Sequence, residues 1–132
     1  MSTEDVVIPG LRPKGYSNGR IGHGRVLHVA GQVGWNADEK FEHAELAPQF
    51  ATALGNVIAV VKAAGGTVTD IAEMTVYVTD MDAYRAARKE LGPAWRERLG
   101  THYPAMALVE VKSLLERQAV VEIQAIAYLE TT

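Results

Sequence analysis

The sequence predicts one α+β domain over residues 1–132, with a mixed β-sheet and two helices packed on one of its faces. Short segments in which apolar and polar residues alternate flank two longer segments with an apolar residue at every third or fourth position. With 132 residues and 48% apolar side chains, the chain is long enough for one buried core. The expected order of elements is β-β-α-β-α-β-β.

The chain is expected to begin with an edge segment and a hairpin. Residues 1–14 contain prolines and a glycine, which favour an irregular or edge segment. Residues 16–21 and 26–33 then have the pattern of two strands. Between them, Gly22 and Gly24 suit the positive φ of a tight turn, so the two strands are expected to pair.

Residues 45–64 have the clearest helical pattern. Pro48 lies in the expected first turn, where its missing N–H costs least, and Gly65-Gly66 ends the helix. The apolar stripe is about as wide as a buried helix face, so this helix is expected to pack on the sheet. The stripe consists of Phe50, Leu54, Val57, Ile58 and Val61.

A strand and a second helix are expected next. Residues 73–79 alternate between apolar and polar side chains, which predicts a strand. Asp80 is suited to cap the following helix. Gly92-Pro93 is expected to kink or interrupt it, because proline removes a backbone hydrogen bond and clashes with the preceding turn. The arginines of this helix alternate with glutamates, so we expect them on a solvated face.

The last two strands, over 103–111 and 119–129, are expected to be neighbours. In the second of them Glu122 is a carboxylate inside an apolar run, where an unpaired charge is expensive to bury. Its neighbours on the face that the helices leave open are too apolar to stay in water, so we expect this face to self-associate. These neighbours are Thr75, Tyr77, Val120, Ile126 and Tyr128.

The composition argues against several classes of protein. The net charge is −3 and the pI about 5.8, so no field attracts nucleic acid or an anionic membrane. There are no cysteines, which excludes disulfides and sulfur-ligated metals. The four histidines share no metal-binding spacing, so no metal is expected. No apolar run approaches a membrane span and the first residues are acidic, which predicts a cytoplasmic protein.

The end of the chain resembles the C-terminal signature of the RidA/YjgF family of reactive intermediate deaminases, also called L-PSP-type proteins. That signature reads Pro-Ala-Arg-Ser/Thr, then an apolar strand and a turn, then Val-Glu-Ile-Glu-Ala. Here the same frame runs from Pro104 to Ala107 and from Val121 to Ala125. The resemblance implies a chorismate-mutase-like α+β fold that assembles as a homotrimer with three clefts between subunits. Weaker matches in the same order cover 16–17, 29–32, 63–66 and 76–81.

The resemblance implies hydrolysis of an enamine or imine to a carbonyl compound and ammonia, without a metal or organic cofactor. Glu122 stands where the family orients the attacking water. A partly desolvated carboxylate can accept and return a proton, and general acid–base catalysis contributes roughly 10²–10⁴ in rate. Alternatively, Glu122 pairs with an arginine between subunits and has only a structural role.

Met106 departs from the family, since it stands where the deaminases have the arginine that binds the substrate's carboxylate. A thioether cannot replace a guanidinium, and each lost hydrogen bond to a charged group costs roughly 1.5–3 kcal/mol. One interpretation is a pocket retuned for a substrate without the usual α-carboxylate. The other is a non-catalytic trimer that binds a small ligand or serves as a scaffold. Carboxylate binding would be restored if Arg12, Arg20 or Arg25 reached the cleft.

The resemblance also implies which residues bind a small-molecule substrate. Tyr16 would close over the substrate, Ser17 would hydrogen-bond it, and Gly31 would let the backbone approach it. Each has an alternative role in packing, and Gly31 can equally mark a β-bulge. Endoribonuclease activity, attributed to some relatives, is disfavoured by the acidic pI. The full substrate-binding set is Tyr16, Ser17, Ala30, Gly31, Tyr103, Met106 and Leu108.

Overall fold

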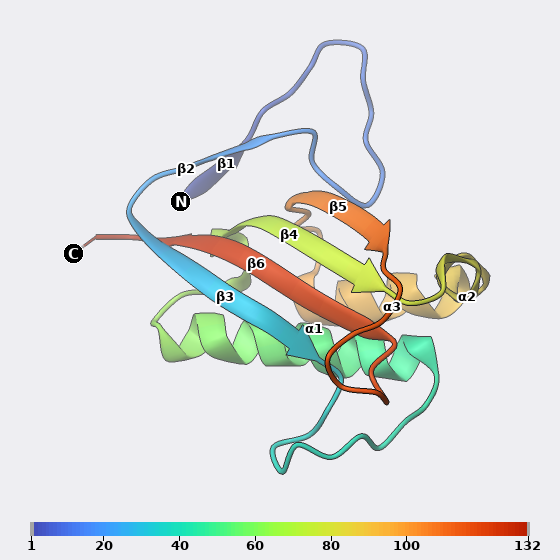
Figure 1. Cartoon of the computed structure of the whole chain (residues 1–132). Coiled ribbons are helices and arrows are strands. Elements are labelled where there is room, and N and C mark those ends of the chain that lie inside the picture. The colour runs from blue at the N-terminus through green and yellow to red at the C-terminus, as the bar shows by residue number, and fades with distance from the viewer. Residues whose placement is uncertain (1, 132) are drawn as a thin grey trace.

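The computed structural model describes residues 2–131, which form an α+β fold as the sequence predicts (Figure 1). The helices are α1 (Leu46–Ala63), α2 (Met81–Ala86) and α3 (Arg88–Leu99), with a 3₁₀ turn at Val68–Asp70. The strands are β1 (Thr3–Asp5), β2 (Arg20–Gly22), β3 (Arg25–Val33), β4 (Ile71–Val78), β5 (Ala105–Glu110) and β6 (Val121–Leu129). A four-stranded sheet has the order β3-β6-β4-β5, and a separate two-stranded sheet pairs β1 with β2.

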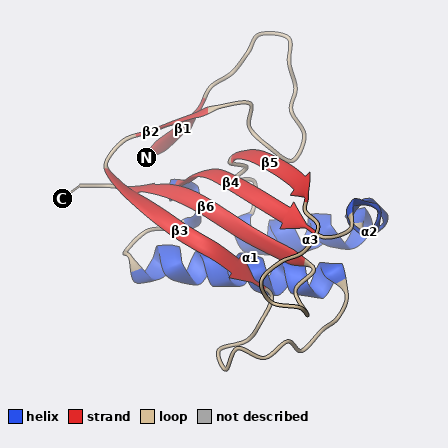
Figure 2. Cartoon of the chain, viewed as in Figure 1, coloured by secondary structure: helices blue, strands red, loops and turns tan. Residues whose placement is uncertain are grey.

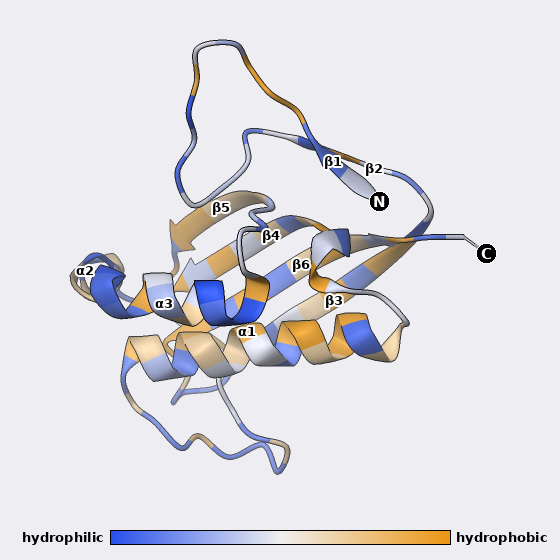
Figure 3. Cartoon of the chain, turned by 180° about the vertical axis from the view of Figure 1, so that it is seen from behind, coloured by the Kyte–Doolittle hydropathy of each residue, from blue (hydrophilic) through white to orange (hydrophobic). Residues whose placement is uncertain are grey.

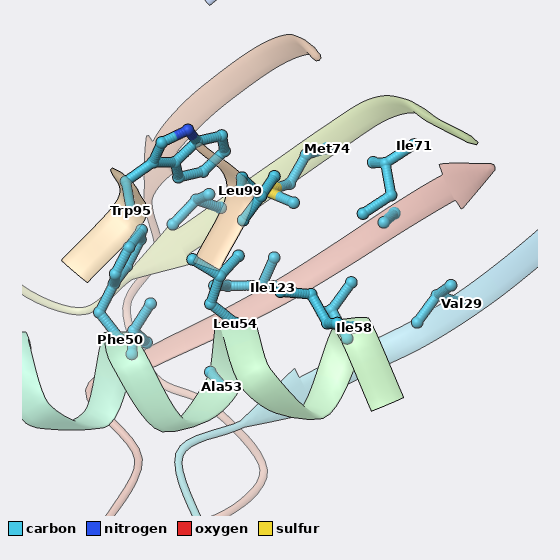
Figure 4. Close-up of a cluster of buried hydrophobic side chains, with 14 of the residues drawn as sticks. Val29, Phe50, Ala53, Leu54, Ile58, Ile71, Met74, Trp95, Leu99 and Ile123 are labelled. Atoms are coloured by element: carbon cyan, nitrogen blue, oxygen red, sulfur yellow. The ribbon is translucent and has the colours of Figure 1, made fainter. Parts of the chain in front are cut away.

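The hydrophobic core lies between the four-stranded sheet and the two longer helices. Figure 2 shows α1 and α3 on the same side of the strands. Alternation along β4 and β6 directs every second side chain into this layer, where Leu54, Met74 and Ile123 are each 0% exposed (Figure 4). Burying such a side chain stabilises the fold by roughly 1.5–3 kcal/mol. The core therefore determines which residues of the strands face away from the helices.

Helix α1 closely matches the prediction over 45–64. Pro48 is its third residue, and Gly65 follows the helix with a φ of +89°, a conformation that favours glycine. By length and composition α1 could cross a membrane, contrary to the expectation that no such segment exists. In this fold its apolar stripe packs against the sheet, and Figure 3 shows α1 as the more hydrophobic of the two long helices. The membrane-like composition of α1 is thus explained by the core.

The second predicted helix is divided, but not at Gly92-Pro93. Helix α2 ends and α3 begins at Ala87, and α3 continues through both residues. Pro93 is exposed, so water can hydrate the carbonyl that proline leaves without its helical partner. The predicted interruption was therefore wrong. Asp80 caps α2 as predicted, because its Oδ1 accepts a hydrogen bond from the N–H of Ala83 at 3.1 Å.

The last two strands are not neighbours, contrary to the prediction. Strand β4 lies between β5 and β6, pairing in parallel with β5 and antiparallel with β6. Parallel neighbours need a long crossover connection, and α2 and α3 supply it between β4 and β5. The sheet thus places β6 at its centre and β5 at its edge.

The predicted hairpin between β2 and β3 does not form, since β2 pairs with β1. Gly24 takes the expected positive φ of +119°. However, Gly22 lies directly on the ring of Tyr128, where a Cβ would be 2.1 Å from Cδ2. The turn therefore directs β2 over β6 instead of alongside β3. As a result Tyr128 is covered by β2 rather than free on the open face of the sheet.

Buried polar side chains hold the N-terminal strands to the rest of the domain. Ser2 donates a hydrogen bond to Oδ1 of the buried Asp70. Thr3 Oγ1 donates to the carbonyl of Thr69 at 2.7 Å and accepts from Arg20 Nη2 at 3.0 Å. Buried carboxyl and hydroxyl groups are stable only when hydrogen-bonded, so these contacts anchor β1 and β2.

His102 should make the fold less stable in acid. Burial lowers the pKa of its imidazole below the ordinary value of 6.5, although a contact of Nε2 with the carbonyl of Ile71 at 2.7 Å opposes this. The unfolded chain therefore binds the proton more readily, and the free energy of unfolding should fall as the pH drops below about 6.5. Urea unfolding near pH 7.5 and near pH 5 measures this loss.

His102→Gln should remove this part of the pH dependence, because glutamine can still donate to Ile71 but does not titrate. His23→Gln, at an exposed position, is the matched control and should behave like the parent protein. Identical pH profiles for the parent and His102→Gln would contradict the prediction.

Candidate functional site

Alternation along the strands places the predicted site residues on opposite faces of the sheet. Met106 of β5 pairs with Met74 of β4, whose side chain is buried in the core, so Met106 points toward the helices. Leu108 shares that face two residues further on. Glu122 of β6 pairs with Tyr77 on the alternate positions and points to the open face. One chain therefore does not bring Glu122 and Met106 together.

An open cavity of about 570 Å³ lies between β5, α3 and the segment before β2. Four predicted substrate-binding residues line it, namely Tyr16, Tyr103, Met106 and Leu108. Trp95 stacks on Tyr103, with ring centroids 5.7 Å apart and an interplanar angle of 1°. Such flat apolar walls suit a planar or apolar ligand. The remaining lining includes Lys14, Phe50, Tyr84, Arg88, Leu91 and Arg96.

Arg88 and Arg96 line this cavity, although the sequence favoured a solvated face for the arginines of this helix. Their spacing could have predicted that they lie together, because Arg88, Gly92 and Arg96 recur at every fourth residue and share one side of α3. Arg12 and Arg20, considered above as substitutes for the missing arginine, line a different cavity of about 400 Å³. The arginines of the larger cavity therefore come from α3.

Glu122 lies against Gly31 at a β-bulge in β3. The register between β3 and β6 shifts between Val29 and Gln32, so Ala30 and Gly31 form the bulge that the sequence allowed as an alternative. Within residues 2–131 the half-buried Glu122 carboxylate has neither a hydrogen bond nor an ion pair. Its oxygens are therefore free to bind a water molecule.

Ser17 lies outside the larger cavity. It is buried, and its Oγ donates a hydrogen bond to the carbonyl of Tyr103. Its N–H donates to the carbonyl of Pro104 at 2.9 Å, and it forms a parallel bridge with Ala105. In this structure Ser17 therefore holds the start of β5 in place and positions the Tyr103 ring.

The two faces offer different chemistry. The open face presents a carboxylate that can accept and return a proton, next to a bulge that exposes backbone. The helix side presents an aromatic cavity with cationic side chains. In the described chain, residues 2–131, no three histidine or acidic side chains gather where they could hold a metal ion.

The chain is similar to known proteins over almost its whole length. A family model described as Endoribonuclease L-PSP matches residues 11–129. A RutC family protein of Pyrococcus horikoshii is 31% identical over 120 residues, which cover 90% of this chain and 91% of that protein. The 2-iminobutanoate/2-iminopropanoate deaminase of Escherichia coli is 34% identical over 104 residues, which cover 79% of this chain and 80% of that protein.

Solved structures agree with these sequence matches. A Rid family protein of unknown function from Yersinia pestis has a TM-score of 0.87 at 27% identity, covering 98% of this chain and 100% of that one. The YjgF gene product of Escherichia coli has a TM-score of 0.70 at 30% identity, covering 94% and 92%. Because the match extends over the fold and is not confined to a short motif, the chain belongs to the RidA/YjgF family.

Proposed function

We propose that this protein hydrolyses reactive imines or enamines to a carbonyl compound and ammonia, without a cofactor. The observation that carries the proposal is Glu122, a half-buried carboxylate with no partner in the described chain, placed against Gly31. It occupies the position at which the family signature orients water. A relative 34% identical to this chain is named a 2-iminobutanoate/2-iminopropanoate deaminase, which supports the reaction type.

We place the reaction in clefts between copies of the chain. Glu122 and Met106 point to opposite faces of one sheet, so a site that contains both needs two copies. The open face supports such an assembly, because partly exposed Tyr77 and Ile126 lie on it together with the half-buried Glu122. A homotrimer with three clefts is the arrangement that the family resemblance implies. A monomeric mass in light scattering would contradict the composite site.

The proposed reaction needs one water molecule and one proton relay. Glu122 accepts a proton from the water as its oxygen bonds to the C=N carbon, and returns it to the nitrogen to give a carbinolamine. The same carboxylate then moves the hydroxyl proton to the amino group, the C–N bond breaks, and ammonia leaves as the carbonyl forms. All atoms of water and imine are recovered in the products, so no oxidant or reductant is required.

The β5 side of the cavity favours a substrate without a carboxylate next to the C=N bond. Met106 and Leu108 make this wall apolar. A 2-imino acid would place its carboxylate against a thioether, which donates no hydrogen bond. Each missing charge-assisted bond costs roughly 1.5–3 kcal/mol relative to an arginine. We therefore propose imines or enamines that lack the α-carboxylate.

Ammonia release from freshly generated imines, one set with an α-carboxylate and one set without, tests this function. The parent protein should act on the neutral set, and Met106→Arg should shift activity toward the carboxylate set. Met106→Leu, which keeps the wall apolar, is the matched control and should retain the parent's preference. Activity of the parent on the carboxylate set alone, or on neither set, would contradict the proposal.

Replacing Gly31 by Ala is expected to displace the catalytic carboxylate. A Cβ there would lie 2.3 Å from Glu122 Oε2 and 2.7 Å from its Cδ, too close for both groups to keep their places. A misplacement of about 1 Å can lower a rate about 10²-fold, so hydrolysis should fall by this order. Gly55→Ala, in α1 with no atom within 4 Å of the new Cβ, should leave the rate unchanged. Parent-like kinetics of Gly31→Ala would contradict the placement of Glu122.

The second candidate is a non-catalytic trimer that binds a small ligand. It is favoured by the aromatic cavity, whose lining in one chain does not include Glu122. A relative, Escherichia coli TdcF, 28% identical to this chain, has been solved with bound serine. Tight ligand binding with no ammonia release from either set of imines would favour this candidate. A cytoplasmic location, and the lack of nucleic-acid or membrane partners, stay expectations from composition.

A further inference from the structure

Two arginines of α3 point a positive charge at the aromatic cavity. Arg88 and Arg96 both line it, eight residues apart on the same side of the helix. The guanidinium of Arg96 lies over Gly92, where a Cβ would be 3.2 Å from Nη1 and 3.7 Å from Nη2. Gly92 thus gives the Arg96 guanidinium room to lie close against the helix, at the edge of the cavity.

Arg88 and Arg96 form no salt bridge with a carboxylate of residues 2–131, unlike two other arginines of α2 and α3. Arg85 pairs with Asp82 at 3.0 Å, and Arg98 lies 3.7 Å from Glu97. Within the described residues 2–131, Arg88 and Arg96 have no such ion pair. Lys14, which also lines the cavity, adds a third positive charge on the facing segment. Like charges around one cavity repel each other, so a bound anion would relieve the repulsion.

Aromatic side chains line the same cavity. Trp95 stacks on Tyr103, and Phe50 contacts Tyr84 edge to face with ring centroids 6.3 Å apart (Figure 4 shows Trp95 beside Phe50). Burial raises the pKa of the Tyr84 hydroxyl, and the charge of Arg88 opposes this rise. The cavity of about 570 Å³ is within the range of small-molecule sites, roughly 300–1,000 Å³.

We infer that this cavity binds an aromatic carboxylic acid, with its ring against Trp95 and Tyr103 and its carboxylate held by Arg88 and Arg96. The anion-binding group of this site therefore lies on α3, whereas the family signature has its arginine on β5 at the position of Met106. The inference rests on the cavity alone for binding. One consequence rests on the proposed function as well: if the cavity binds the imine substrates, these substrates carry an acidic group several bonds from the C=N carbon.

Fluorescence of Trp95 measures this binding directly. The chain has two tryptophans, so Trp35→Phe leaves Trp95 as the single reporter. The probes are 3-phenylpropanoate and its neutral analogue 3-phenylpropanamide, which differ only in the charged group. The carboxylate should bind at least about 10-fold more tightly than the amide, and its affinity should fall as salt increases.

Two arginine variants and one control locate the interaction. Arg88→Met and Arg96→Met should each weaken carboxylate binding by about 10-fold or more and change amide binding little. Arg98→Met, on the same helix but outside the cavity lining, should bind both probes as the parent does. Equal affinity for the two probes, no binding of either, or parent-like affinity in both cavity variants would overturn the inference.

The same titration in a Glu122→Gln protein separates this inference from the proposed function. Carboxylate binding at least as tight as in the parent is expected there, because the variant removes only a negative charge and leaves Arg88 and Arg96 in the cavity lining. If the parent binds the acid but releases no ammonia from any imine, the cavity assignment stands and the deaminase proposal fails. If the parent releases ammonia from imines but binds the two probes with equal affinity, the deaminase proposal stands and the cavity assignment fails.

Discussion

Replacing Glu122 by Gln is expected to lower the rate of imine hydrolysis by roughly 10²–10⁴, the contribution of general acid–base catalysis. The amide keeps the size and shape of the side chain against Gly31 but cannot accept the proton of the attacking water. The effect should fall on kcat, since the isosteric amide leaves the residues that line the substrate-binding cavity unchanged. Ammonia release under saturating imine measures it.

Glu73→Gln is the matched control for this prediction. Glu73 is an exposed carboxylate of β4 that pairs with Ile126 on the same open face. Its replacement removes one negative charge from that face without touching Gly31 and should leave the rate unchanged. Equal activity of Glu122→Gln and the parent would remove Glu122 from the mechanism, whereas equal losses in both variants would point to a general charge effect.

Gln49→Leu is expected to lower the free energy of unfolding by about 3–6 kcal/mol, because it leaves several buried backbone groups unpaired. The Gln49 side chain is 0% exposed. Its Nε2 donates to the carbonyls of His43 at 2.9 Å and Gln118 at 2.8 Å, and its Oε1 accepts from the N–H of Val120 at 2.9 Å. Leucine has a similar volume but makes none of these bonds.

This loss is a large part of the stability of an ordinary domain, roughly 5–15 kcal/mol in total. Denaturant unfolding measures it, and Gln118→Leu is the control, because its side chain is exposed and only its backbone carbonyl contacts Gln49. A change below about 1 kcal/mol in Gln49→Leu would show that water replaces the lost hydrogen bonds.

Residue periodicity was sufficient to predict α1 and which faces of β4 and β6 are buried, but not the break between α2 and α3 at Ala87. The stripe of α1 reports directly which side is buried, and Asp80 and Gly65 have conformational preferences that depend on a few neighbours only. Likewise, alternation around Glu122 showed that this carboxylate shares a face with Tyr77. These properties are local, so a single sequence contains them.

Lateral order in the sheet is not local, and there the predictions failed. Alternation in β5 and β6 gives their faces but not their neighbours, so it could not show that β4 lies between them. For the same reason the sequence did not show that Met106 and Glu122 lie on opposite faces of the sheet, because their orientation depends on how β5 and β6 each pair with β4. Gln49 was missed for a related reason, since two of its three partners, Gln118 and Val120, are distant in sequence.

The arginines of the cavity show a different limit. Charges at every fourth residue of a helix are usually solvated, and only the position of β5 beside α3 turns Arg88 and Arg96 into cavity residues. Their spacing was visible in the sequence, whereas the strand that faces them was not. Whether arginines at helical spacing are solvated or line a cavity therefore depends on the long-range pairing of strands.

Complementation between subunits tests most directly the central claim that two copies build one active site. Two inactive variants, Glu122→Gln and the cavity-blocking Leu108→Trp, are unfolded together in equal amounts and refolded as mixed trimers. A cleft is active only when the Leu108→Trp subunit provides Glu122 and the Glu122→Gln subunit provides the open cavity. Random mixing meets both conditions in about a quarter of the clefts, so about a quarter of the parent's ammonia release should return. Mixed trimers of the correct mass with no activity would contradict the composite site.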